Sequence, residues 1–125
     1  MKNKKILIID DEEPIRNLYT YKFKLGGYEV ESAKDGKSGL KSMQIFVPDI
    51  VLLDLMMPEM NGDIMLEKLR ATSFGKDLKV IVLTNMGEQE IPESVRKLGV
   101  NAVILKADMT PRQVTELVKK QLITK

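Results

Sequence analysis

The residues best suited to chemistry are polar side chains that directly follow short apolar runs. Asp10 and Asp11 follow one such run, and Asp54, Thr84 and Lys106 each follow another. Each residue has an ordinary structural explanation when it is taken alone, because Asp often begins a turn and Lys is usually a surface charge. A chance occurrence of such residues at the ends of four apolar runs is much less probable than a chance occurrence at one of them. The pattern therefore predicts that these side chains form one site.

The charge of this group indicates what it binds. Three carboxylates of −1 and one Lys of +1 leave a net charge of −2. Two like charges about 4 Å apart repel by about 4 kcal/mol at an effective dielectric constant of about 20. A divalent cation would neutralise the site, and without His or Cys in the chain the best candidate is Mg²⁺, which prefers oxygen ligands.

An aspartate carboxylate is a known nucleophile for phosphoryl transfer. A metal ion and Lys106 would offset negative charge on the transferring oxygens, and the Thr84 hydroxyl would hydrogen-bond to one of them. The residues therefore favour a site that receives a phosphoryl group.

The elements that position these residues are five predicted strands, over residues 5–9, 28–32, 50–53, 78–83 and 101–105. Helical patterns alternate with them over 14–25, 36–46, 62–69, 92–98 and 111–122, while 73–77 is predicted as a loop and 86–90 as a polar linker. This alternation is typical of an α/β fold with a parallel sheet and helices on both faces. Ligands of such sheets bind at the carboxyl ends of the strands.

Composition narrows the classes of function. The 125 residues suit one domain over 1–125, and the net charge of +2 is too balanced for a nucleic-acid binder. The absence of His and Cys excludes Ser-His-Asp and Cys-His catalysis and thiolate metal sites. No signal peptide or membrane-spanning run is visible, so we expect a cytoplasmic protein that binds neither nucleic acid nor membrane.

The chain resembles the receiver domain of a two-component response regulator, in particular the stand-alone chemotaxis type. The resemblance covers nearly all of the sequence. It rests on four motifs, which are Ile8-Ile9-Asp10-Asp11-Glu12, Asp54-Leu55-Met56-Met57-Pro58-Glu59-Met60-Asn61-Gly62, Leu83-Thr84 and Lys106. It implies a doubly wound, flavodoxin-like five-stranded parallel sheet of order 2-1-3-4-5.

The resemblance also implies a function. Asp54 would accept a phosphoryl group from the phosphohistidine of a sensor histidine kinase or phosphotransfer protein, and Thr84 and Lys106 would bind the phosphoryl oxygens. Mg²⁺ would be held by Asp11, Asp54 and the Met56 carbonyl, with Asp10 reaching it through water. An unknown downstream partner would bind the fourth helix, fifth strand and last helix. Such a protein is a switch, with no enzymatic activity beyond self-catalysed phosphorylation and slow autodephosphorylation.

Two positions depart from the family pattern. Ala107 follows the lysine where the family usually has a proline after a cis peptide bond, and we expect a trans bond because a non-proline cis bond costs about 2.5–4 kcal/mol. Val103 stands where the family usually has an aromatic residue that turns inward on activation. Because a β-branched side chain has no such swing, we expect the segment from Met86 to Ile91 to move instead.

Two other classes of function stay open at this stage. A haloacid-dehalogenase-type phosphohydrolase also uses an Asp nucleophile, but it requires a second acid two residues later, where this chain has Met56. A degenerate receiver that only binds partners is disfavoured because the acidic residues, Thr84 and Lys106 are all present. A dinucleotide-binding enzyme is less favoured still, because the first strand leads into acidic residues and not into a glycine-rich turn.

Overall fold

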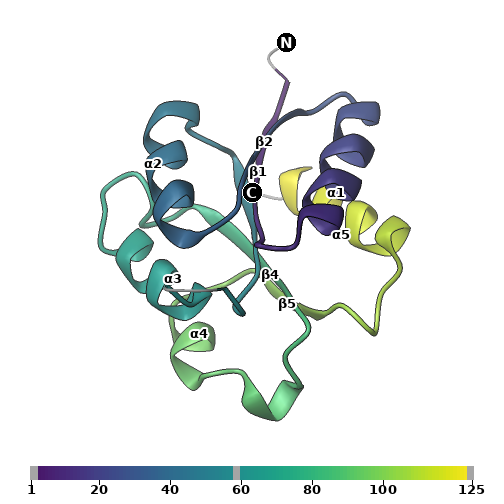
Figure 1. Cartoon of the computed structure of the whole chain (residues 1–125). Coiled ribbons are helices and arrows are strands. Elements are labelled where there is room, and N and C mark those ends of the chain that lie inside the picture. Colours follow the sequence, from purple (N-terminus) through teal and green to yellow (C-terminus); the bar gives the residue numbers. More distant parts are fainter. Residues whose placement is uncertain (1–2, 58–59, 124–125) are drawn as a thin grey trace.

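A computed structural model describes residues 3–57 and 60–123 (Figure 1). Pro58, one of the two prolines that bound the central strand in the sequence, lies outside the described residues, as does Glu59. None of the helices in the described ranges combines the length and apolar character that a membrane span requires.

The described residues form one parallel sheet of order β2-β1-β3-β4-β5, which confirms the expected topology. Its strands are β1 (Lys5–Ile9), β2 (Glu29–Ala33), β3 (Ile50–Leu53), β4 (Lys79–Thr84) and β5 (Ala102–Leu105). The residues of β3 are all buried, as a strand covered on both faces requires, whereas most of the edge strand β2 is accessible to solvent.

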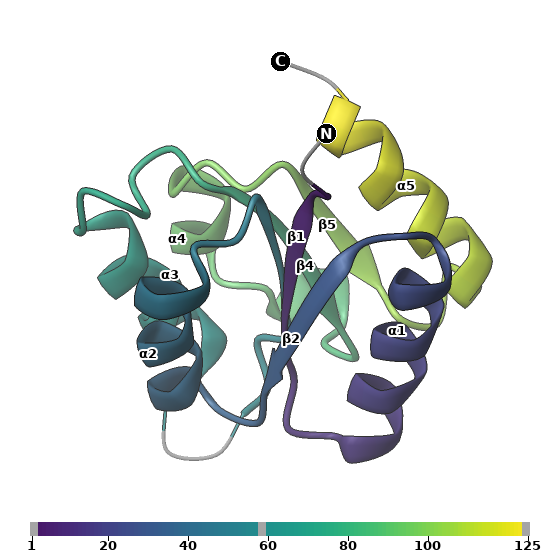
Figure 2. The same cartoon turned by 90° about the horizontal axis from the view of Figure 1, so that it is seen from above.

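Helices cover both faces of the sheet (Figure 2). On one face lie α1 (Glu13–Leu25) and α5 (Pro111–Ile123), and on the other lie α2 (Gly36–Phe46), α3 (Gly62–Arg70) and α4 (Glu93–Lys97). Each face has its own apolar core, because side chains alternate between the two sides of a strand. Ile8 and Leu52 pack toward α1 and α5, while Leu7, Ile9 and Leu53 pack toward the other three helices.

The two ends of α2 contrast in their capping. At the start, the Asp35 carboxylate accepts a hydrogen bond of 2.7 Å from the Ser38 amide, a favourable N-cap. At the end, Val47 adopts a left-handed conformation with φ 51°, and its amide donates to the Met43 carbonyl. A β-branched residue is strained in this region, and the following Pro48 restricts its backbone further. Val47 is 61% exposed, so packing does not compensate for the strain.

The segment after β4 differs from the prediction. Residues 86–90, which we read as a polar linker, contain a short 3₁₀ helix, η1 (Glu88–Glu90). Three exposed polar residues carry no apolar periodicity, so the sequence pattern gives no signal for such a turn. The peptide bond between Lys106 and Ala107 is trans as expected, since none of the described peptide bonds is cis.

Arg70, the last residue of α3, binds backbone carbonyls of two other segments. Its guanidinium donates to the carbonyls of Gly75 and Leu78 at 2.8 and 2.6 Å, and to those of Leu98 and Gly99 at 2.8 and 3.1 Å. Burial lowers the pKa of the Arg70 guanidinium. These bonds tie the loop before β4 and the turn after α4 to the end of α3.

Candidate functional site

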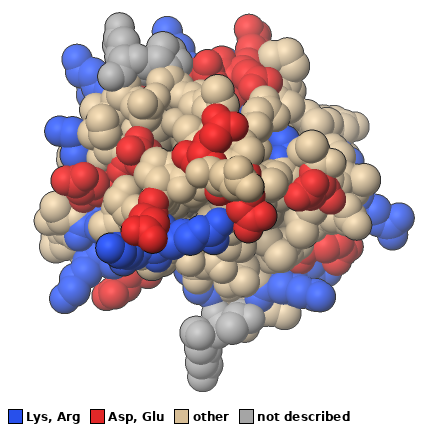
Figure 3. All heavy atoms as spheres, turned by 90° about the horizontal axis from the view of Figure 1, so that it is seen from below, with Lys and Arg blue, Asp and Glu red and all other residues tan. Residues whose placement is uncertain are grey.

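Backbone pairing brings the predicted site residues to one edge of the sheet. The amides of Asp10, Asp54 and Lys106 extend the ladders beyond the strand ends, donating to the carbonyls of Ala33, Ile9 and Thr84 at 3.1, 2.9 and 2.8 Å. The backbone of each of these residues is therefore held by the neighbouring strand. Figure 3 looks onto this edge and shows acidic atoms over the middle of the face.

Asp54 is the most buried carboxylate of the described site, with only 2% of the residue exposed. Its Oδ1 accepts a hydrogen bond of 3.2 Å from the Met56 amide, and its Oδ2 lies 3.6 Å from the Lys106 ammonium. Burial raises the pKa of Asp54, Lys106 opposes this change, and the nearby Asp10 carboxylate adds to it. The hydrogen bond fixes the carboxylate and leaves Oδ2 facing the cation.

Asp10 forms the closest ion pair of the site, with its Oδ2 3.0 Å from the Lys106 ammonium. Its other oxygen accepts from the Glu12 amide at 2.9 Å, and its backbone carbonyl accepts from Arg16 at 2.8 Å. Burial raises the pKa of the Asp10 carboxyl. Burial alone would lower the pKa of Lys106, but its carboxylate neighbours outweigh that effect and raise it, so Lys106 is cationic.

Thr84 ends β4 and is completely buried. Its hydroxyl oxygen accepts a hydrogen bond of 3.2 Å from the Met86 amide, and a hydrogen bond from this hydroxyl also favours the ionised form of Asp54. The two contacts set the hydroxyl between the site and the segment that leads to η1.

The carboxylates have the right chemistry for a hard cation. One oxygen from each of Asp10, Asp11, Glu12 and Asp54 lies within 4.8 Å of the other three. Asp11 is exposed, so this group opens to solvent. Oxygen donors at this spacing fit a divalent ion such as Mg²⁺. Met56 is 50% exposed. Its predicted role concerns its backbone carbonyl, for which no contact is seen among the described residues.

The structure brings Asp10, Asp54, Thr84 and Lys106 together, and it adds one residue to which sequence reasoning gave no role. Glu12 is the last residue of the first acidic motif. Its Oε1 lies 3.4 Å from the Lys106 ammonium and accepts a hydrogen bond of 3.1 Å from the Asn85 side-chain amide. The only signal in the sequence was its place beside the acidic pair.

Comparison with known proteins assigns the chain to a family. The family profile described as "Response regulator receiver domain" matches residues 6–119. The Bacillus subtilis alkaline phosphatase synthesis transcriptional regulatory protein PhoP is 34% identical over 117 residues, which are 94% of this chain and 48% of PhoP. The sporulation initiation phosphotransferase F of the same organism is 34% identical over 99 residues, covering 79% of this chain and 78% of the relative. The chain spans about half the length of the first curated relatives it matches, PhoP among them.

Solved structures agree with this assignment. A CheY-like receiver domain protein from Methanospirillum hungatei superposes with a TM-score of 0.88 at 30% identity, over 97% of this chain and 94% of that one. The response regulator TrrA from Thermotoga maritima, solved in complex with Mg²⁺-BeF, superposes with a TM-score of 0.82 at 31% identity. The match covers 96% of this chain and 99% of TrrA. The chain therefore belongs to the response regulator receiver domain family, whose members are signalling switches that take phosphoryl groups from histidine kinases or phosphotransfer proteins.

Proposed function

We propose that Asp54 is the phosphoryl acceptor of this protein. A carboxylate oxygen attacks the phosphorus of a phosphohistidine in a sensor kinase or phosphotransfer protein, so that a P–O bond forms as the P–N bond breaks. The electron pair of that bond stays with the departing imidazole. The observation that carries this proposal is the buried Asp54 carboxylate, fixed by the Met56 amide and facing Lys106 at the end of the central strand.

Lys106 and Thr84 are the groups that receive the transferred oxygens. Lys106 is cationic and already lies 3.6 Å from the Asp54 carboxylate, so it is placed to stabilise charge that develops on the phosphoryl group. The Thr84 hydroxyl is a neutral donor on the neighbouring strand. Both therefore act on the transferring group and not on the incoming histidine.

We further propose that Asp11, Asp54 and the Met56 carbonyl hold Mg²⁺, with Asp10 reaching it through water. The clustering of four carboxylate oxygens supports this ligand set. When bound, Mg²⁺ offsets the negative charge of the carboxylates and of the phosphoryl oxygens. Without Mg²⁺, Lys106 is the only cation among the described residues that forms an ion pair with a carboxylate of the acidic cluster.

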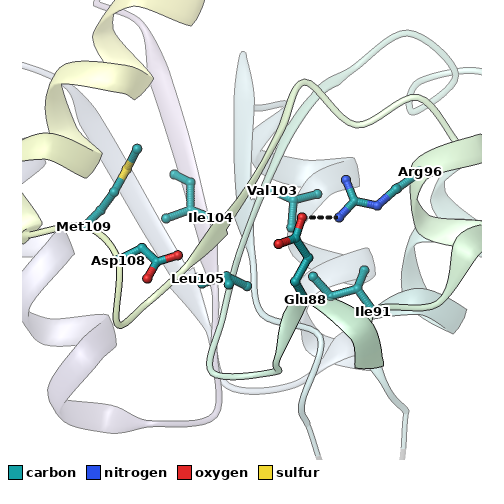
Figure 4. A pocket seen from close by; sticks show the side chains of 8 residues that line it. All are labelled: Glu88, Ile91, Arg96, Val103, Ile104, Leu105, Asp108 and Met109. Carbon is teal, nitrogen blue, oxygen red and sulfur yellow. Dashed lines mark ion pairs between the residues drawn. The ribbon is translucent and has the colours of Figure 1, made fainter.

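The signal reaches a downstream partner through α4, β5 and α5. A cavity of about 230 Å³ opens between η1, α4, β5 and the loop that joins β5 to α5 (Figure 4). Val103 and Ile91 line its apolar part, and an ion pair of 3.8 Å joins Glu88 of η1 to Arg96 of α4 beside them. Because only three residues separate Thr84 from η1, a shift of Thr84 toward a phosphoryl group would move Glu88 and with it the edge of this cavity. Val103 stays in place throughout.

We also propose slow autodephosphorylation. Met56 and Met86 each lie two residues after a residue that contacts the phosphoryl group, and both amides bond to that residue's side chain. Long apolar side chains at these two positions hinder an attacking water, so the phosphorylated form is long-lived. All of these properties belong to a single receiver domain over residues 1–125.

The test is phosphorylation by a small acyl phosphate in the presence of Mg²⁺, followed by intact mass. We expect wild type and Asp108→Asn to gain one phosphoryl mass and Asp54→Asn to gain none. Asp108 is exposed and lies outside the acidic cluster, so it controls for the same chemical change elsewhere. A wild-type protein that never gains this mass would refute phosphorylation and favour the alternative of a receiver that only binds partners.

A further inference from the structure

Glu12 joins two strand ends that lie far from it in the sequence. Its Oε1 contacts the ammonium of Lys106, 94 residues away, and the side-chain amide of Asn85, 73 residues away. The Glu12 side chain is 43% exposed and Asn85 is exposed, so both contacts lie on the rim of the site. We infer that Glu12 is a positioning residue that restrains Lys106 and Asn85 in the unphosphorylated protein. This inference rests on the proposed phosphorylation of Asp54.

Three carboxylates compete for the Lys106 ammonium. Its ammonium lies 3.0 Å from Asp10, 3.4 Å from Glu12 and 3.6 Å from Asp54, so the acceptor carboxylate has the longest of the three contacts. A cation shared among three carboxylates has to weaken some of these contacts before it can bind phosphoryl oxygens. Asp10 is buried and cannot replace Lys106 with bulk water, whereas Glu12 can. The Glu12 contact is therefore the one that is exchanged.

The contact with Asn85 extends the restraint to the segment after β4. Asn85 directly follows Thr84, which faces Asp54, and it precedes Met86 and η1. While Glu12 accepts from Asn85, the start of this segment is tied to the loop before α1. A carboxylate that holds both Lys106 and Asn85 thus opposes the movement of each toward a phosphoryl group, and its own charge repels an anionic donor.

The chain offers a matched control. Glu13 is the neighbouring acid, it is exposed, and its carboxylate makes no ion pair or hydrogen bond with the described residues of the site. Glu12→Gln and Glu13→Gln remove the same charge from adjacent positions. Glutamine at position 12 also keeps an oxygen that accepts from Asn85, so the comparison isolates charge from shape. Glu12→Ala removes both the charge and the oxygen that accepts from Asn85.

The experiment measures the initial rate of Asp54 labelling against the concentration of a small acyl phosphate, at Mg²⁺ concentrations where doubling the ion changes nothing. We expect Glu12→Gln to raise the second-order rate constant by about two- to fivefold, the range that an exposed ion pair supports. Glu12→Ala should match or exceed this increase, and Glu13→Gln should change the rate less than twofold. Added salt should accelerate wild type more than Glu12→Gln, because salt screens the repulsion that the variant lacks.

A second readout does not depend on phosphorylation. In metal-free protein, the NMR signals of the Asn85 side-chain amide should shift in Glu12→Ala and stay in place in Glu13→Gln, with melting temperatures within about 3 °C of wild type.

If the amide shifts but Glu12→Gln labels no faster than Glu13→Gln, the contact exists without restraining the reaction and the inference is wrong. Slower labelling of Glu12→Gln would also overturn it, because Glu12 would then assist phosphorylation. If wild type is never labelled while the amide still shifts, the proposed function has failed and the contact itself has not.

Discussion

Replacing Asp54 by Asn should stabilise the protein in metal-free buffer while abolishing phosphorylation. Asn is nearly isosteric with Asp, and it removes a buried charge from a crowded acidic site. At an effective dielectric constant of about 20, the attraction of Lys106 at 3.6 Å is worth about 4.6 kcal/mol. Repulsion from one carboxylate within 4.8 Å opposes it by at least about 3.5 kcal/mol. Repulsion from Asp11 and Glu12 exceeds the remainder, so Lys106 does not compensate for the cost of burying the charge.

The stabilisation follows from that residual cost. We expect a gain of about 1–2 kcal/mol, since an effective dielectric constant of about 20 already includes much of the relaxation around the charge. Unfolding entropies near 2.1 cal/mol/K per residue make 1 kcal/mol equivalent to about 4 °C for a chain of 125 residues. The melting temperature of Asp54→Asn should therefore exceed that of wild type by about 4–8 °C.

The pH dependence separates this explanation from others. The pKa of Asp54 is raised in the folded protein, so the destabilising charge is present above the raised pKa and disappears as the pH falls below the ordinary value of 3.8, where Asp54 is protonated in both states. The advantage of Asp54→Asn should be full at neutral pH and vanish in acid. Asp108→Asn should show less than about 0.5 kcal/mol at any pH.

Thermal unfolding measured with and without Mg²⁺ provides the assay. Wild type should gain more stability from added Mg²⁺ than Asp54→Asn, because the variant lacks one proposed ligand and binding stabilises the folded state by mass action. Equal or lower stability of Asp54→Asn in metal-free buffer at neutral pH would refute the reasoning. It would mean that Lys106 compensates fully for burial and repulsion.

Three further outcomes follow from the structure. Combining Met56→Asn with Met86→Glu should speed loss of the phosphoryl group, measured by intact mass over time, and an unchanged rate would show that the two methionines do not hinder water. Val103→Ala should lower stability by no more than about 1 kcal/mol. It should leave both Asp54 labelling and phosphorylation-dependent partner binding nearly unchanged; loss of that binding with normal labelling would contradict readout through the segment after β4. Val47→Asn should raise the melting temperature by about 4 °C, because Asn tolerates the left-handed conformation at φ 51° about 1 kcal/mol better than valine, and a decrease would show that the position is not strained.

The sequence predicted most of the fold because its signals were strong and local. Apolar runs such as Ile50–Leu53 have few alternatives to a buried strand, and the polar residues that end them meet at one edge of any parallel sheet. The positions of Asp54 and Lys106 at that edge follow from the topology alone. The roles of these residues in Mg²⁺ binding and phosphoryl transfer do not follow from the topology, since they depend on the ligands that bind at this edge.

The features that escaped prediction depend on tertiary contacts. Glu12 reads as one more acid at a helix start, and its direction toward Lys106 is fixed only when β5 is in place. Val47 carries no sign of a left-handed conformation, because valine is among the residues least suited to it. Arg70 reads as an ordinary cation in a last helical turn, although it binds four backbone carbonyls.

The carbonyl contacts of Arg70 bear on protein engineering. The loop between α3 and β4 is polar and distant from the acidic site, so it resembles a safe place for an inserted tag or a fluorescent label. Yet Arg70 binds the carbonyls of Gly75 and Leu78 there, and a side chain at Gly75 would meet the Leu69 carbonyl at 2.3 Å. An insertion in this loop would remove two of the four acceptors that hold Arg70, the same side chain that binds the turn at Gly99 after α4. A probe placed there would disturb the surface it was meant to report on.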